Sequence, residues 1–246
     1  MRSRTGLTVR SFTPARAGEL PPVLLVHGFA SDGVQDWVET GIARALTEAG
    51  RSVIVPDLRG HGSSPAPSAA REVDAPGLVT DLVTVLDEAG ADTFDVVGYS
   101  LGARLAWELP EAAPGRLRRA VLGGLSPAEP FEAVNVQELH QAVADGTEPT
   151  DPLTSAITNL VLTHEARAAG LALCVEGLRS TPFTPRSWSG RTPPVIIVGK
   201  DDAMARGIER VLDLLGAGEL ITVAGDHHEI LGGAAFRPTV LEVLAR

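Results

Sequence analysis

Apolar residues along the chain follow two alternating patterns. Short runs of consecutive apolar residues predict strands that are buried on both faces of a sheet, and a first segment that alternates apolar and polar residues predicts a half-exposed strand. The segments between them carry apolar residues at every third or fourth position, which is typical of helices with one buried face. The predicted strands are residues 7–12, 23–26, 53–55, 94–98, 118–125, 195–198 and 220–223.

Helical patterns separate most of these strands. The predicted helices are residues 37–49, 74–88, 101–109, 205–215 and 234–245. Because buried strands that alternate with helices form parallel sheets covered on both sides, we expect an α/β fold with a mainly parallel sheet and helices on both faces. The alternation runs nearly from end to end, so the chain is expected to form a single domain over residues 1–246.

Residues 126–190 break the alternation. This stretch shows no strong strand pattern, and apolar residues recur at helical spacing over 134–144, 153–164 and 166–178. We therefore expect a helical insert within the domain, after the strand that ends near Leu125.

Charge and cysteine content indicate which binding partners and which cellular compartment to expect. The net charge is −10 and no run of five basic residues occurs, so nucleic acids and anionic membranes are not expected partners. The single cysteine, Cys174, rules out an internal disulfide. The first twenty residues lack the apolar core of a signal peptide and no apolar stretch approaches 18 residues, so a cytoplasmic location is expected. Nothing in the sequence indicates an oligomeric state.

Ser100 lies at a sharp predicted corner between a strand and a helix, in the stretch "GYSLG". A close crossing of strand and helix leaves no room for side chains at Gly98 and Gly102. Such a corner exposes the serine hydroxyl above the sheet, at the positive end of a helix. Other polar side chains follow strand ends, where ligands bind in open sheets of this kind. They are His27, Asp57, Asp201, Asp202 and His227.

The chain resembles the α/β-hydrolase family over almost its whole length. Besides "GYSLG", the stretches "VLLVHGFA" and "PDLRGHGSS" are similar to loops that border the family's active site. The stretches "VIIVGKDD" and "VAGDHH" stand where the family carries its acid and its histidine, and the order serine, aspartate, histidine is the family's order. The resemblance implies the α/β-hydrolase fold, a small helical cap formed by residues 126–190, and chemistry without a cofactor.

The same resemblance assigns catalytic roles. Ser100 is the expected nucleophile and His227 the base that removes its proton, because a free serine hydroxyl is a poor nucleophile. Asp202 is the expected acid that holds the histidine's tautomer. The neighbours Asp201 and His228 remain alternatives.

A further alternative acid is Glu129, which follows the preceding strand. Backbone N–H groups of Phe29 and Leu101 are expected to form the oxyanion hole, with Ala30 as the alternative to Phe29. Tyr99, Phe29 and Leu125 are expected to contact the substrate. Further candidates for the pocket wall are Phe131, Phe183 and Trp188.

His27 and His61 are interpreted as structural residues within the family's loops. No metal ion is expected, because adjacent residues such as His227 and His228 usually point apart. Neither glycine-containing loop matches a phosphate-binding motif, so no nucleotide cofactor is expected.

These features predict a serine hydrolase that cleaves a small to medium carboxylic ester, a small molecule, through an acyl-enzyme. Thioesters, lactones and carbon–carbon bonds are alternative substrates for the same three residues. Serine at position 100 argues against haloalkane dehalogenases and most epoxide hydrolases, which carry aspartate there. A non-catalytic binding protein on the same fold is the alternative from another class.

Overall fold

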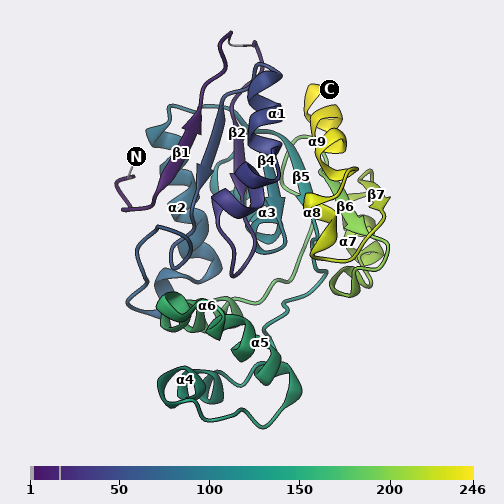
Figure 1. The fold of residues 1–246 in the computed structure, drawn as a ribbon. Helices are drawn as coiled ribbons and strands as arrows, with labels where there is room; N and C mark the ends of the chain where they lie inside the picture. The colour runs from purple at the N-terminus through teal and green to yellow at the C-terminus, as the bar shows by residue number, and fades with distance from the viewer. Residues whose placement is uncertain (1–2, 17) are drawn as a thin grey trace.

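A computed structural model describes residues 3–16 and 18–246, which form a sheet flanked by helices (Figure 1). The described residues build a seven-stranded sheet in the order β1-β3-β2-β4-β5-β6-β7, in which only β1 runs antiparallel to its neighbour. The strands are β1 Val9–Phe12, β2 Val23–Val26, β3 Val53–Pro56, β4 Phe94–Tyr99, β5 Leu117–Gly123, β6 Val195–Gly199 and β7 Glu219–Val223.

Helices cover both faces of this sheet, and others lie beyond one of its ends (Figure 1). They are α1 Ile42–Glu48, α2 Ala75–Glu88, α3 Leu101–Ala112, α4 Val136–Asp145, α5 Pro152–Leu162, α6 Ala168–Ser180, α7 Glu209–Leu215, α8 Glu229–Gly232 and α9 Phe236–Ala245. Successive residues of the central strands point to opposite faces: Leu24 packs in one core cluster with residues of α2 and α3, and Leu25 in the other with residues of α1 and α9. The expected mainly parallel sheet with helices on both faces is confirmed.

Two predicted helices are divided in the structure. The helix expected over residues 37–49 consists of a π-helical turn, Val34–Glu39, and α1, because Gly41 between them has a left-handed backbone with a φ of 75°. The helix expected over 205–215 is likewise a short turn, Ala203–Ala205, followed by α7, and Gly207 between them has a φ of 83°.

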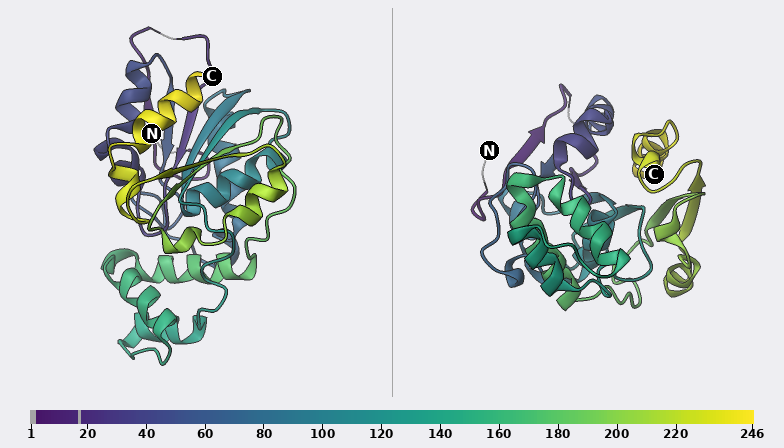
Figure 2. Two further views of the ribbon diagram at one scale, coloured as in Figure 1. Left: turned by 90° about the vertical axis from the view of Figure 1, so that its right-hand side faces the viewer. Right: turned by 60° about the horizontal axis from the view of Figure 1, so that its bottom comes forward.

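The segment between β5 and β6 contains α4, α5 and α6, which gather below one end of the sheet in Figures 1 and 2. The helix starts follow local capping rules. Asn135 and Asp151 accept hydrogen bonds from the N–H groups of Glu138 and Thr154, at 3.3 and 2.8 Å, and so fix the first turns of α4 and α5. Among the helices of the described residues, none has the length and apolar character needed to cross a membrane.

The loop after β3 is organised by the buried carboxylate of Asp57. This carboxylate accepts hydrogen bonds from Arg10 at 2.6 Å, from the Gly33 N–H at 3.0 Å and from the Ser63 N–H at 2.8 Å. Burial opposes ionisation of Asp57, but these bonds outweigh it and lower the pKa of the carboxyl group. Asp57 therefore connects β1, the loop after β2 and the loop after β3.

We expect Asp57→Asn to lower the free energy of unfolding by about 3 kcal/mol at pH 7, because Arg10 loses its buried counterion. A carboxyl group whose pKa is lower in the folded state stabilises the fold above its unfolded pKa of about 3.9, and this contribution disappears as the pH falls through the folded value. Urea unfolding of both proteins from pH 7 down to pH 3 is the measurement. A difference that did not shrink below pH 4 would contradict this electrostatic account.

Candidate active site

Ser100 sits between the end of β4 and the start of α3, with a φ of 51° that non-glycine residues rarely adopt. Hydrogen bonds hold this strained backbone in place: the Ser100 N–H donates to Gly123 O at 2.8 Å, and Ser100 O accepts from Ala103 at 3.0 Å and Arg104 at 3.1 Å. The unusual backbone conformation places the Ser100 hydroxyl group above the sheet. Strained backbone conformations are often found at functional sites.

Glycines on both sides of Ser100 allow the strand and the helix to touch. A Cβ atom built on Gly98 would lie 2.2 Å from the Gly102 carbonyl oxygen, and one on Gly102 would lie 1.9 Å from the Val26 carbonyl oxygen. Both distances are far below van der Waals contact, and the opposing atoms belong to the backbone. The structure therefore has the close approach that the sequence indicated at positions 98 and 102.

We expect Gly102→Ala to destabilise the fold by about 3 kcal/mol or more, since the added methyl group must push β2 and α3 apart. Gly232→Ala is the matched control, because a Cβ there has no atom within 4 Å. Thermal unfolding of the two purified variants tests the difference. Equal melting temperatures would show that the crossing of β2 and α3 tolerates a side chain.

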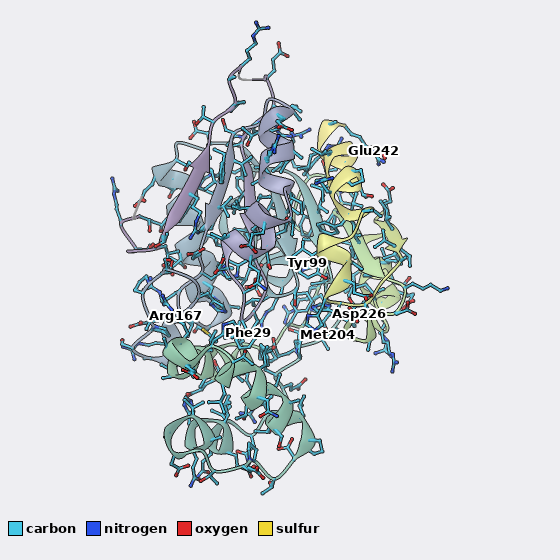
Figure 3. All side chains as sticks on the ribbon, in the orientation of Figure 1. Phe29, Tyr99, Arg167, Met204, Asp226 and Glu242 are labelled. Carbon is cyan, nitrogen blue, oxygen red and sulfur yellow. The ribbon has the colours of Figure 1, made fainter. Side chains whose placement is uncertain are left out.

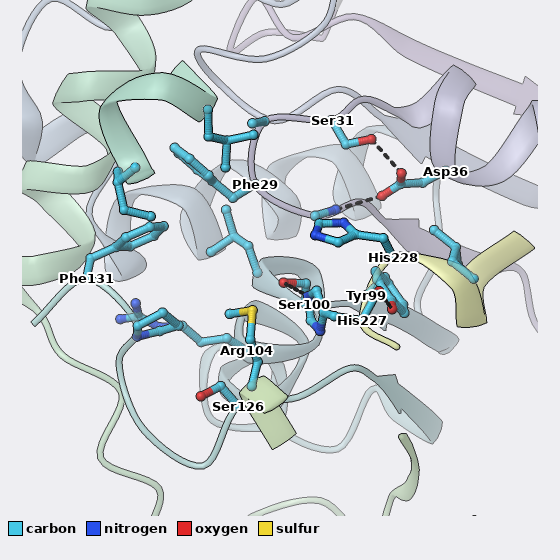
Figure 4. Close-up of a pocket in the computed structure, with 18 of the residues that line it drawn as sticks. Phe29, Ser31, Asp36, Tyr99, Ser100, Arg104, Ser126, Phe131, His227 and His228 are labelled. Carbon is cyan, nitrogen blue, oxygen red and sulfur yellow. Dashed lines mark hydrogen bonds between the residues drawn. The ribbon is translucent and has the colours of Figure 1, made fainter. Parts of the chain in front are cut away.

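The structure brings Ser100, His227 and Asp202 together in one hydrogen-bonded chain. His227 Nε2 lies 3.0 Å from Ser100 Oγ (Figure 4). His227 Nδ1 lies 2.9 Å from Asp202 Oδ2. Ser100 follows β4, Asp202 follows β6 and His227 follows β7, so the three residues meet at the carboxyl ends of parallel strands. This is the geometry of a nucleophile, a base and an orienting acid.

Asp202 is held as a carboxylate by its surroundings. Its side chain is fully buried, and its second oxygen accepts the Met204 N–H at 2.9 Å. Burial opposes ionisation, but the hydrogen bonds from His227 and Met204 outweigh it and hold the pKa of Asp202 below its usual range. A negative charge beside Nδ1 stabilises a positive charge on the His227 ring.

The alternative residues lie elsewhere. Asp201 is exposed, and its backbone N–H donates to Gly225 O at 3.1 Å. His228 borders the cavity described below, but among the hydrogen bonds of the described residues none joins its ring to Ser100. Glu129 is paired with Arg104 and not with His227.

Tyr99 has a role that the sequence did not reveal. Its hydroxyl group donates a hydrogen bond to the backbone carbonyl of His227, and the two rings are 5.5 Å apart. Burial raises the pKa of Tyr99, so the phenol stays protonated and remains a donor. Tyr99 is thus both a wall of the cavity and a support for the loop that carries His227.

The residues named for the oxyanion hole line the same cavity as Ser100. Within the described part of the chain, no hydrogen bond uses the N–H of Leu101, Phe29 or Ala30. The N–H of Gly28, by contrast, donates to buried Asp36 at 2.8 Å, and that bond fixes the loop after β2. The role of Phe29 and Leu101 in an oxyanion hole stays a prediction.

His27 supports the same loop from behind. Its Nε2 accepts the Leu58 N–H at 2.9 Å, and its Nδ1 donates to Gly28 O at 2.7 Å, which defines a neutral tautomer. His61 packs against His27 and Phe29, and burial lowers the pKa of His61 to about 3. Both histidines are buried, and their contacts are with the loops that border the site.

A cavity of about 470 Å³ opens at Ser100. Phe29, Tyr99 and Leu101 line it, as do Phe131 and Phe183. In Figure 3, the labelled side chains Phe29 and Met204 lie where the sheet meets α4–α6. The remaining apolar lining comes from Ala30, Ala128, Pro130, Ile157, Leu160, Met204 and Leu231.

Two expected wall residues lie outside the lining. Leu125, in the loop after β5, is fully buried in the core and does not line the cavity. Trp188 packs against Trp107 at a ring distance of 5.3 Å instead.

The fold agrees with comparisons to known proteins. Residues 21–150, more than half of the chain, match the family profile described as the alpha/beta hydrolase fold. The chain belongs to the α/β-hydrolase family.

Its relatives include proteins with different reactions. Epoxide hydrolase A of Mycobacterium tuberculosis is 40% identical over 96 residues, which are 38% of this chain and 29% of that protein. Lipase LipV of the same organism is 34% identical over 130 residues, which are 53% of this chain and 46% of the lipase. The chain thus spans less than half the length of both relatives. An esterase from Exiguobacterium antarcticum shares the fold, with a TM-score of 0.73, 18% identity and coverage of 100% of this chain and 98% of its own.

Proposed function

We propose that the chain is a serine hydrolase that cleaves a small to medium carboxylic ester through an acyl-enzyme. The observation that carries this proposal is the continuous hydrogen-bonded chain from Ser100 through His227 to Asp202. It stands at the mouth of a largely apolar cavity, which suits an acyl group.

The geometry supports a two-step reaction. Ser100 Oγ attacks the ester carbonyl while its proton passes to His227 Nε2, and the negative oxygen is held by the Leu101 and Phe29 N–H groups. His227 then gives the proton to the leaving alcohol oxygen, and the acyl group remains on Ser100. Water repeats the sequence with His227 as base, which releases the acid and restores the serine.

Residues 126–190 would act as a small cap in this reaction. Ile157 and Leu160 of α5 line the cavity opposite the sheet, so the insert supplies part of the acyl pocket. A volume of about 470 Å³ accommodates a short or medium acyl group with its alcohol.

The relatives do not all point to esters. A serine nucleophile forms an acyl intermediate only with a carbonyl compound, and an epoxide has none, so the likeness to epoxide hydrolase A does not extend to its reaction here. Thioesters, lactones and carbon–carbon bonds next to a carbonyl remain chemically open to Ser100. The lipase among the relatives and the esterase that shares the fold favour an ester.

The test combines turnover with capture of the intermediate. We expect the purified chain to hydrolyse p-nitrophenyl acetate, butyrate and octanoate, and rapidly quenched samples to carry one acyl group on the peptide that contains Ser100. Turnover of thioesters or lactones without turnover of these esters would replace the ester class. Absence of any acylated Ser100 with all three classes would favour a binding protein on the same fold.

A further inference from the structure

The cavity wall contains a buried guanidinium group. Arg104 lies on α3, one helical turn beyond Ser100, and is only 5% exposed. Figure 4 shows it on the same side of the cavity as Phe131. A buried cation needs acceptors, and Arg104 finds two: its Nη1 donates to the Glu129 carboxylate and its Nη2 donates to the Thr181 carbonyl oxygen.

These two acceptors stand at the two ends of the helical segment that follows β5. Glu129 lies before α4, and Thr181 directly follows α6. The side chain of Thr181 also accepts the Ala75 N–H of α2 at 3.1 Å. Arg104 therefore joins the helix of the nucleophile to the chain entering α4–α6 and to the chain leaving it.

The pair of Arg104 and Glu129 extends this connection to two aromatic walls of the cavity. Glu129 Oε1 accepts the backbone N–H of Phe131 at 3.2 Å, and the chain two residues before Phe183 is held by the bond from Arg104 to the Thr181 carbonyl oxygen. Burial raises the pKa of Glu129, and Arg104 and the Phe131 N–H group oppose that shift. The ion pair thus reaches the main chain at Phe131 through Glu129 and the main chain just before Phe183 through Arg104.

Ring contacts also hold these two segments: Phe131 lies 4.9 Å from Phe29, and Phe183 lies 6.0 Å from Trp107, between ring centroids. The Nε of Arg104 has no hydrogen-bond partner among the described residues, and Glu108 lies 3.9 Å from it. The Arg104–Glu129 pair therefore adds a polar tie between α3 and the main chain at Phe131 to the apolar packing of the two rings.

We propose that Arg104 and Glu129 are positioning residues that set the acyl-chain preference of the cavity by fixing Phe131 and Phe183. This inference rests on the proposed function. The pair touches neither His227 nor Asp202 through any hydrogen bond found in the described chain, so it acts on the pocket wall and not on proton transfer.

The effect depends on acyl length. One helical turn is about 5.4 Å, and an acetyl group has only one carbon beyond the carbonyl, so it stays close to Ser100. An octanoyl chain extends past that distance to the wall. Loosening the wall therefore changes the binding of octanoate far more than that of acetate.

The test compares Glu129→Gln and Arg104→Met with Arg51→Met. Arg51 is the matched control, because it is 4% exposed and pairs with buried Asp95 near the start of β4, at the other end of that strand from Ser100. We expect the octanoate-to-acetate ratio of kcat/KM to change by about tenfold or more in the first two variants, mainly through KM for octanoate. In Arg51→Met the ratio keeps its wild-type value.

A second readout does not need activity. Amide hydrogen exchange of the peptides that contain Phe131 and Phe183 should accelerate in Glu129→Gln and stay unchanged in Arg51→Met. If a single variant fails to fold, the double variant Arg104→Met/Glu129→Gln removes the uncompensated charge and serves in its place.

The inference would be overturned if both the octanoate-to-acetate ratio and the amide hydrogen exchange stayed at their wild-type values. It would also be overturned if all esters lost activity equally and Arg51→Met showed the same loss. Failure of the proposed function looks different: the wild type would turn over no ester, while the exchange experiment would still report whether the pair fixes the two phenylalanines.

Discussion

Ser100→Ala is expected to lower kcat for ester hydrolysis by about 10⁴-fold or more, because no other group can form the acyl-enzyme. The hydroxyl makes one side-chain hydrogen bond in the structure, to His227 Nε2, so its removal should shift the free energy of unfolding by only about 1 kcal/mol. The measurements are initial rates with p-nitrophenyl butyrate and a thermal unfolding curve of the same preparation.

Ser126→Ala is the control for this variant. Ser126 also lines the cavity, but its hydroxyl group donates to Ala128 O at 2.8 Å and lies outside the chain from Ser100 to Asp202. We expect this variant to retain activity within about a few-fold of the wild type. Similar losses in the two serine variants would mean that Ser100 is not the nucleophile.

Asp202→Asn is expected to lower kcat by about 10⁴-fold without unfolding the protein. The amide is nearly isosteric, but it cannot stabilise the imidazolium of His227 by charge, and its NH2 group would favour the wrong tautomer of the ring. The rates are measured between pH 6 and 9, where Asp202 is ionised in the wild type because its pKa is already low.

Asp201→Asn provides a matched control one residue away. Asp201 is exposed, and the charge that it loses faces solvent. Its rates should stay close to those of the wild type. If Asp201→Asn were the inactive variant and Asp202→Asn the active one, the acid would be assigned to the wrong aspartate.

The sheet and the positions of Ser100, Asp202 and His227 could be predicted because each leaves a local mark in the sequence. Apolar runs mark the strands, and a glycine-flanked serine marks the corner. The register within "GKDD" and "GDHH" came from resemblance, and hydrogen bonds join Asp202 and His227, the residues chosen. Their catalytic roles stay predictions.

Contacts between residues that are far apart in the chain have no local signal in the sequence, so they could not be predicted. The hydrogen bond from Tyr99 to the His227 carbonyl spans 128 positions, and Arg104 meets Thr181 across 77. Asp36 reads as an ordinary polar residue in the sequence, yet it is buried and holds the loop at Gly28. Leu125 was expected at the cavity because it follows a strand. A position after a strand does not show in which direction the side chain points, and Leu125 is buried in the core. The division of the predicted helix over 37–49 was also missed, because the apolar spacing does not show that Gly41 has a left-handed backbone.

The three residues of the hydrogen-bonded chain follow strands that are far apart in the sequence, so activity requires the complete sheet. Ser100 follows the central strand β4, whereas Asp202 follows β6 and His227 follows β7, which come after α4–α6 in the chain, and β7 is one of the two edge strands. Closing so long a connection is the entropically slow part of assembly. An intermediate with β1 to β5 in place would hold its serine correctly and have no base. Regain of hydrolysis during refolding would therefore report the docking of β6 and β7, whereas circular dichroism reports the helix and strand content of the whole chain.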